Sequence, residues 1–175
     1  MRNKKTNDIV MIAMFTSMVM AATYIGIPTP GSMGGYWHLG TLVMMTISLK
    51  YGWKYGMLAG GIGMTLFDIF SPWAVWAPAT LVIRLTMGAL IGFIAYDKTK
   101  GQGMNIYRNI IGLTLGSIIM LIGYFIFQAW LLSGDSAGYD KAIISIPGNL
   151  MQIVVGFISL YLIRFLPEKD SINIT

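Results

Sequence analysis

The stretch YRNIIGLTLGSIIMLIGYFIFQAWLL, residues 107–132, decides the fold class. Its charged side chain, Arg108, lies at the start, and the residues that follow are predominantly apolar. A helix that crosses the hydrocarbon core of a bilayer needs roughly 17–25 such residues. The stretch is therefore predicted to be a transmembrane helix.

Five further segments share this character, so the sequence predicts an all-α integral membrane protein built as a six-transmembrane-helix bundle. Pro28 and Pro167 would end the first and last helices, while Pro78 and Pro147 suit the first turn of theirs. No long linker divides the chain, so we expect a single membrane domain over residues 1–175. The predicted spans cover residues 8–27, 38–49, 53–70, 77–96, 107–132 and 146–166.

Composition agrees with a membrane protein and excludes several kinds of site. Hydrophobic residues make up 55% of the chain and charged residues only 11%, against about a quarter in soluble domains. The absence of cysteine excludes disulfides and thiolate metal sites. A single histidine, His38, argues against a multi-histidine metal centre, and no cofactor is expected.

The positive charges lie in alternate loops, which predicts the orientation of the chain. The remaining loops contain almost no lysine or arginine, and Lys141 is the one basic residue of 133–145. By the positive-inside rule, both termini are predicted to be cytoplasmic, in the plasma membrane of a bacterial-type cell. Because the charges are placed between apolar runs, we expect the bilayer and not nucleic acid as the partner. The residues that set this pattern are Arg2, Lys4, Lys5, Lys50, Lys54, Lys98, Lys100, Arg108, Arg164 and Lys169.

The loops on the predicted outer side are rich in glycine, proline and aromatic residues, which suggests a site on that face. Tyr36, Trp37, Trp73, Trp76 and Trp130 all fall there. They fit either an interfacial aromatic belt or a surface that stacks on a flat ligand. Trp37 and Trp76 are the best candidates for ligand contact.

Asp68 and Arg84 are ionisable residues near the outer ends of two adjacent predicted helices. An ionisable group inside a membrane is costly unless it is paired or faces water. The two residues are therefore expected either to form a structural ion pair or to line a ligand pocket.

Four polar residues on the same side are further candidates for ligand binding: His38, Gln128, Asn149 and Gln152. Asn149 and Gln152 are three residues apart, so they share one helix face. Each of the four could instead brace a loop or form hydrogen bonds between helices.

Ala13, Ser17 and Ala21 recur every four residues in the first predicted helix. Such a stripe of small residues allows close helix contact, either inside the bundle or with another membrane protein. The small residues of 59–63 are expected to serve packing within the chain. There is no phosphate-binding loop and no catalytic set of side chains, so the chain is not expected to be an enzyme or to hydrolyse ATP.

Three motifs give a resemblance to a known family. They are GYWHLG at 35–40, AGGIG at 59–63 followed by Asp68, and WAPATLVIR at 76–84 followed by Met87 and Gly88. Over residues 8–166 the chain resembles the substrate-binding S components of energy-coupling factor (ECF) vitamin transporters, and within them the hydroxymethylpyrimidine and pyridoxine-like subgroup. Thr41 departs from this pattern, because many relatives carry aspartate there.

The resemblance implies a function and a set of partners. The chain would bind a small vitamin or precursor under an external loop, then dock through Ala13, Ser17 and Ala21 on a transmembrane coupling subunit driven by two ATPases. The regions that would line the pocket are those of Trp37, His38, Asp68, Trp76, Arg84, Asn149 and Gln152. We add Tyr36 and Gln128 to the predicted substrate-binding residues. The alternative is a stand-alone small secondary transporter or channel.

Overall fold

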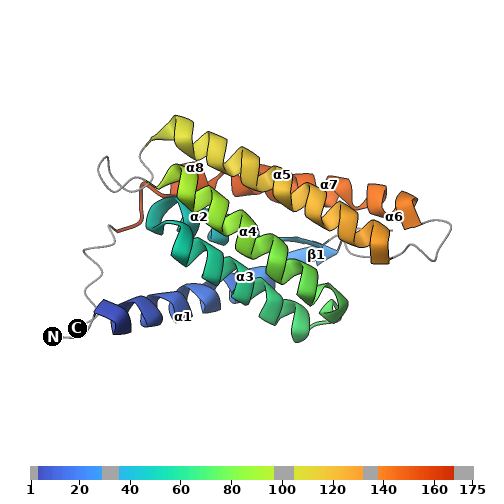
Figure 1. Ribbon diagram of the computed structural model, residues 1–175, viewed down its shortest axis with the longest axis horizontal. Helices are drawn as coiled ribbons and strands as arrows, with labels where there is room; N and C mark the ends of the chain where they lie inside the picture. The colour runs from blue at the N-terminus through green and yellow to red at the C-terminus, as the bar shows by residue number, and fades with distance from the viewer. Residues whose placement is uncertain (1–3, 29–35, 97–104, 132–137, 168–175) are drawn as a thin grey trace.

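A computed structural model describes residues 4–28, 36–96, 105–131 and 138–167, and these are mostly helical (Figure 1). The helices are α1 (Lys4–Thr23), α2 (Gly40–Tyr51), α3 (Trp53–Ile69), α4 (Ala77–Ala95), α5 (Ile106–Leu131), α6 (Gly138–Ile144), α7 (Ile146–Gly156) and α8 (Ser159–Leu162). A 3-10 turn, η1 (Ala74–Trp76), precedes α4, and two short strands, β1 (Gly26–Pro28) and β2 (Tyr36–His38), lie between α1 and α2.

Four stretches of the described chain are long and apolar enough to cross a membrane: Lys5–Thr23, Ala74–Ala95, Ile106–Leu131 and Tyr139–Leu162. Helices α2 and α3 have 12 and 17 residues. At about 1.5 Å per residue they are shorter than the roughly 30 Å hydrocarbon core. The described structure is thus mostly helical, with four candidate spans and two shorter helices.

The two strands correct the predicted ends of the first two spans. They pair antiparallel, with Gly26 opposite His38 and Pro28 opposite Tyr36. Helix α1 therefore ends at Thr23 and not at residue 27, and α2 begins at Gly40 and not at residue 38. A side chain at Gly26 would come within 2.3 Å of the Trp37 carbonyl oxygen, so this close pairing requires glycine.

The sixth predicted span, 146–166, is interrupted. Its helix α7 ends at Gly156, and the backbone then makes turns with i to i−3 hydrogen bonds, such as Ile158 N–H to Val155 O at 3.0 Å, before α8. Gly156 lets α2 approach, because a Cβ there would lie 2.3 Å from the Met45 sulfur. Upstream, α6 lies directly before α7, with Pro147 in the first turn of α7.

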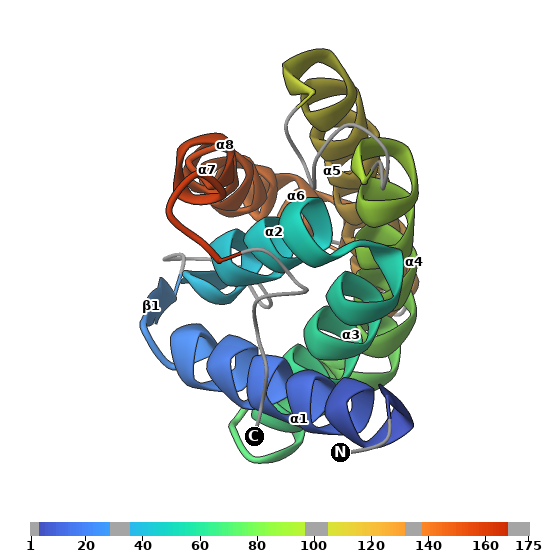
Figure 2. The same cartoon turned by 90° about the vertical axis from the view of Figure 1, so that its left-hand side faces the viewer.

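Helix α2 is the centre of the bundle. Ten of its 12 residues are buried, and it contacts α1, α3, α4, α7 and α8 (Figure 2). Glycines bring the surrounding helices together. A Cβ at Gly63 would lie 2.7 Å from the Thr16 carbonyl oxygen of α1, and one at Gly92 would lie 2.3 Å from the Trp53 amide nitrogen. The packing role predicted for the small residues of 59–63 is confirmed.

The elements meet at two distinct ends of the molecule. The start of α1, the turn between α2 and α3, the end of α4 and the start of α5 lie together at the left of Figure 1. The strands, η1 and α6 lie towards the opposite end. Lys50 and Lys54 flank the α2–α3 turn, where Gly52 has a φ of +91°, a conformation that favours glycine.

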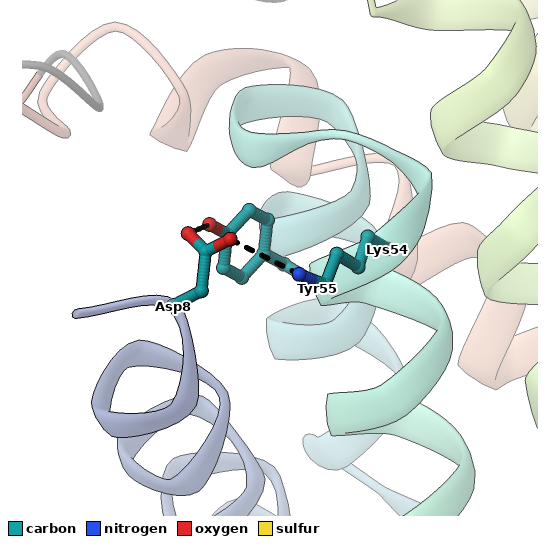
Figure 3. Close-up of polar contacts among 3 residues, drawn as sticks. All are labelled: Asp8, Lys54 and Tyr55. Atoms are coloured by element: carbon teal, nitrogen blue, oxygen red, sulfur yellow. Dashed lines mark hydrogen bonds and ion pairs between the residues drawn. The ribbon is translucent and has the colours of Figure 1, made fainter. Parts of the chain in front are cut away.

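At the first of these ends, α1 is held to α3 by a small polar cluster (Figure 3). Lys54 Nζ lies 3.0 Å from Asp8 Oδ2, and the Tyr55 hydroxyl donates a hydrogen bond to Asp8 Oδ1. Because the Lys54 side chain is 45% exposed, the ion pair itself adds little stability. Buried Tyr55 also packs edge-on against Phe15 of α1.

Candidate functional site

A pocket lies at the end of the bundle that carries the strands and η1. It encloses about 500 Å³ of space not filled by atoms, part of it open to solvent. Helices α1, α3, α4, α5 and α7 contribute to its wall, together with β2 and the loop through η1. The lining residues are Thr23, Tyr36, His38, Met64, Phe67, Asp68, Trp73, Trp76, Thr80, Arg84, Tyr124, Gln128, Asn149 and Gln152.

Arg84 is one of the two charged residues that line this pocket and is only 1% exposed. Its Nη2 donates to Gln152 Oε1 at 3.0 Å, its Nη1 to Thr41 Oγ1 at 3.1 Å, and its Nε to the Tyr124 hydroxyl at 3.2 Å. Nη1 also points at the sulfur atoms of Met87 and Met120. The guanidinium thus ties α4 to α2, α5 and α7 through neutral acceptors.

Asp68 faces the same pocket without forming an ion pair with Arg84 in the described structure. Instead, the Tyr124 hydroxyl that accepts from Arg84 donates to Thr80 Oγ1 at 3.1 Å, and a further side-chain hydrogen bond joins Thr80 to Asp68. The two charges are therefore connected by two hydroxyl groups. The structure places both residues around one cavity, which was one of the two expectations.

Thr41 and Gln152 connect Arg84 to β2. The Thr41 hydroxyl donates to Gln152 Oε1 at 2.6 Å, and Gln152 Nε2 donates to the backbone oxygen of Tyr36. Thr41 is fully buried and does not itself line the pocket, but its hydroxyl accepts a hydrogen bond from Arg84. Thr41 therefore offers Arg84 a neutral hydroxyl and not a carboxylate.

Aromatic rings form the upper wall of the pocket. Tyr36 stacks on Phe67 with ring centroids 5.4 Å apart and an angle of 11° between the planes, and Trp73 packs against Tyr36 at 5.8 Å. Trp76, only 5% exposed, packs against Phe127 at 5.4 Å. A flat ligand would meet ring faces and edges here.

His38 lies in β2, outside the helices, and is 7% exposed. Burial, and then the positive charge of Arg84, hold the pKa of its imidazole well below the ordinary value. It is therefore a neutral group at physiological pH, able to act as a hydrogen-bond donor or acceptor.

Eight of the nine predicted binding residues line the pocket: Tyr36, His38, Asp68, Trp76, Arg84, Gln128, Asn149 and Gln152. Trp37 does not line it, because it alternates with Tyr36 and His38 along β2. Trp130 is 68% exposed, as expected for a residue of an interfacial aromatic belt. Gln128 also bonds between helices, since its Nε2 donates to the Lys141 carbonyl oxygen at 3.3 Å.

The sequence did not single out six lining residues as binding residues: Thr23, Met64, Phe67, Trp73, Thr80 and Tyr124. Helical spacing could have found two of them. Thr80 lies one turn before Arg84 on α4, and Tyr124 lies one turn before Gln128 on α5. The predicted loop over the pocket, residues 29–35, and the basic residues Lys98, Lys100, Arg2 and Lys169 lie outside the described residues.

Comparison with known proteins identifies the family. The model of the family described as ECF-type riboflavin transporter, S component matches residues 3–166. A protein of Pyrococcus woesei described as an uncharacterized protein in gap 3′ region is 30% identical over 142 residues, 81% of this chain and 88% of its own. The thiamine precursor transporter HmpT of Lactococcus lactis subsp. cremoris is 24% identical over 98% of this chain and 94% of its own.

A solved structure of the S component of a bacterial ECF transporter shares the fold. It superposes with a TM-score of 0.66 at 18% identity, over 93% of this chain and 96% of that one. Both the fold and the family model therefore point to the same class of protein, a transporter S component. The chain belongs to the ECF-type riboflavin transporter S component family, so it is a transporter subunit and not an enzyme.

Proposed function

We propose that the chain is the high-affinity substrate-binding subunit of an ATP-driven ECF importer for a small water-soluble vitamin or cofactor precursor. Hydroxymethylpyrimidine and vitamin B6 forms are the proposed substrates. The observation that carries the proposal is the pocket itself, in which Asp68 and Arg84 face one ring-walled cavity.

Two observations support a substrate smaller than riboflavin. The part of this space that can hold a water-sized solute is only about 40 Å³, below the roughly 300–1,000 Å³ range of small-molecule sites, so the pocket is narrow. HmpT, similar to this chain along almost its whole length, is a thiamine precursor transporter. Two ionisable groups on the cavity wall also suit a polar heterocycle.

We further propose six membrane crossings, formed by α1 to α5 and the α6–α8 segment, with both termini in the cytoplasm and the multi-pass chain in the plasma membrane. The shorter α2 and α3 would cross as part of the bundle, with α2 shielded by its neighbours. The basic residues at the α2–α3 turn and at the start of α5 support this orientation, since they lie at the end opposite the pocket.

The coupling subunit and two ATPases are the proposed partners, docked through the stripe Ala13, Ser17 and Ala21. All three residues are exposed on α1, while Met11, Phe15 and Val19 fill the buried face of the same helix. The stripe therefore does not pack within the bundle. A shallow groove beside it is formed by Ile9, Ile12, Ala13, Thr16, Ser17 and Ile62.

Ligand binding by the detergent-purified chain tests the proposed substrate. Trp73 and Trp76 line the pocket, so tryptophan fluorescence should report occupancy directly. We expect hydroxymethylpyrimidine or pyridoxine to quench this fluorescence at lower concentration than riboflavin. Tighter binding of riboflavin would contradict the proposed substrate class.

Uptake into proteoliposomes tests the proposed partners. The lone chain should bind ligand without hydrolysing ATP, and uptake should appear only when the coupling subunit and ATPases are added. Gradient-driven uptake by the lone chain would instead establish a stand-alone secondary transporter.

A further inference from the structure

The carboxylate of Asp68 has one oxygen that is not used within the protein. Asp68 is 8% exposed and lines the pocket, and its hydrogen bond with Thr80 accounts for one contact. Its Oδ2 is buried and has no hydrogen-bond partner within the described structure. A buried acceptor without a partner destabilises a protein, so a donor placed against Oδ2 by a ligand would be bound favourably.

Arg84, the opposite charge in the pocket, is already occupied. Its Nε, Nη1 and Nη2 all donate to acceptors on α2, α5 and α7. A carboxylate or phosphate on a ligand would have to displace these contacts to form the bidentate pair that arginine prefers. The pocket therefore offers a ligand the unpartnered acceptor Asp68 Oδ2, whereas the Arg84 donors already have partners within the protein.

The charges in the pocket also balance. Asp68 and Arg84 carry opposite charges on the same cavity wall, and His38 is neutral. A ligand with no net charge leaves this balance intact. An anionic ligand would place a second negative charge near Asp68 in a poorly solvated space, where like charges are costly.

We propose that Asp68 Oδ2 accepts a hydrogen bond from an exocyclic amino group on a ring heterocycle, and that the pocket selects the uncharged amino-heterocycle over its phosphate ester. The aromatic wall of Tyr36, Phe67 and Trp76 would contact the ring, while Asp68 accepts the hydrogen bond from the amino group. This inference rests on the proposed function and specifies its substrate class.

The test compares three probes on the detergent-purified full chain. They are 4-amino-5-hydroxymethyl-2-methylpyrimidine, the same ring with hydrogen in place of the amino group, and the phosphate monoester of the first. For the unmodified protein we expect the amino probe to bind about tenfold or more tighter than either analogue, as for a charge-assisted hydrogen bond. This measurement needs no variant, so it does not depend on how a variant folds.

Two variants then assign the effect to one residue. Asp68→Asn should weaken the amino probe about tenfold and the deaminated ring less than about threefold, because only the first uses the charged acceptor. Asp8→Asn makes the same chemical change at the far end of the bundle, beside Lys54 and Tyr55, and should leave all three affinities unchanged.

The outcomes separate this inference from the proposed function. Equal affinity for the amino and deaminated rings, or equal weakening of both by Asp68→Asn, overturns the role of Asp68 and leaves the substrate class standing. A phosphate ester that binds as tightly as the free pyrimidine overturns the selection for an uncharged ligand. Failure of the unmodified chain to bind either the pyrimidines or pyridoxine overturns the proposed substrate class together with this inference.

Discussion

Asp68 and Arg84 line one pocket and are connected through the hydroxyl groups of Thr80 and Tyr124, not through a direct ion pair. This spacing keeps a charged acceptor and a charged donor apart on the wall of a small cavity. A direct pair would neutralise both groups and leave little for a polar ligand to bind. The separation therefore favours a binding role over a purely structural one.

Replacing Arg84 by lysine should impair both folding and binding. Lysine keeps the charge but lacks the planar set of donors that reach Thr41, Tyr124 and Gln152 together. We expect a ligand affinity about tenfold lower and a stability loss of about 1–3 kcal/mol from the unsatisfied partners. Fluorescence titration and thermal unfolding in detergent measure the two effects.

Arg164→Lys is the matched control, since Arg164 is exposed beyond α8. This variant should change neither the ligand affinity nor the stability measurably. If Arg84→Lys behaves like this control, the geometry of the guanidinium is not required.

Helices α3 and α4 should separate when Gly92 is changed to alanine. The added Cβ would lie 2.3 Å from the backbone nitrogen of Trp53, and backbone cannot move aside cheaply. We expect destabilisation of about 1–3 kcal/mol, typical of overpacking, measured by thermal unfolding.

Gly112→Ala provides the comparison for this prediction. Its nearest contact would be the Ile91 carbonyl oxygen at 3.1 Å, so a smaller loss is expected. Equal losses in the two variants would show that close approach at Gly92 does not limit the packing.

The stability of the protein should fall as the pH is lowered, with a contribution from His38. Burial and the charge of Arg84 lower the pKa of His38 in the folded protein, while the unfolded chain has the ordinary value of about 6.5. Between these two values the unfolded state binds more protons. The contribution of His38 is therefore complete above about pH 6.5 and is lost as the pH falls through the folded-state value.

His38→Gln isolates this effect, because glutamine cannot take up a proton. Thermal unfolding of both proteins between pH 8 and pH 5 should show a smaller pH-dependent loss in the variant. Identical pH profiles would mean that His38 does not become protonated on unfolding.

A bulky residue on the exposed stripe of α1 should block transport without affecting binding. Ser17→Trp places a large ring on the proposed docking surface, on the exposed face of α1 and nearly two turns from the pocket residue Thr23. We expect unchanged ligand affinity in the isolated chain and loss of ATP-dependent uptake in proteoliposomes with the coupling subunit and ATPases.

Val82→Trp tests whether any bulky surface residue has this effect. Val82 is 64% exposed on α4, away from the stripe, and this variant should retain uptake. Equal inhibition by both variants would remove the support for docking through α1.

The membrane class could be predicted from the sequence alone, because the length and polarity of an apolar run can be compared with the bilayer without knowing which helices touch. It also identified eight of the lining residues. Some are polar side chains inside apolar runs, which need a partner or a cavity, and the others belong to loops rich in aromatic residues. The three-dimensional structure was needed to show which polar groups form hydrogen bonds within the protein and which lack a partner there. Whether Arg84 reaches Asp68 or Thr41, and whether Trp37 or Trp73 faces the pocket, depends on helix rotation and on the register of β1 with β2. Those are set by packing between residues distant in the chain, and no local pattern encodes them.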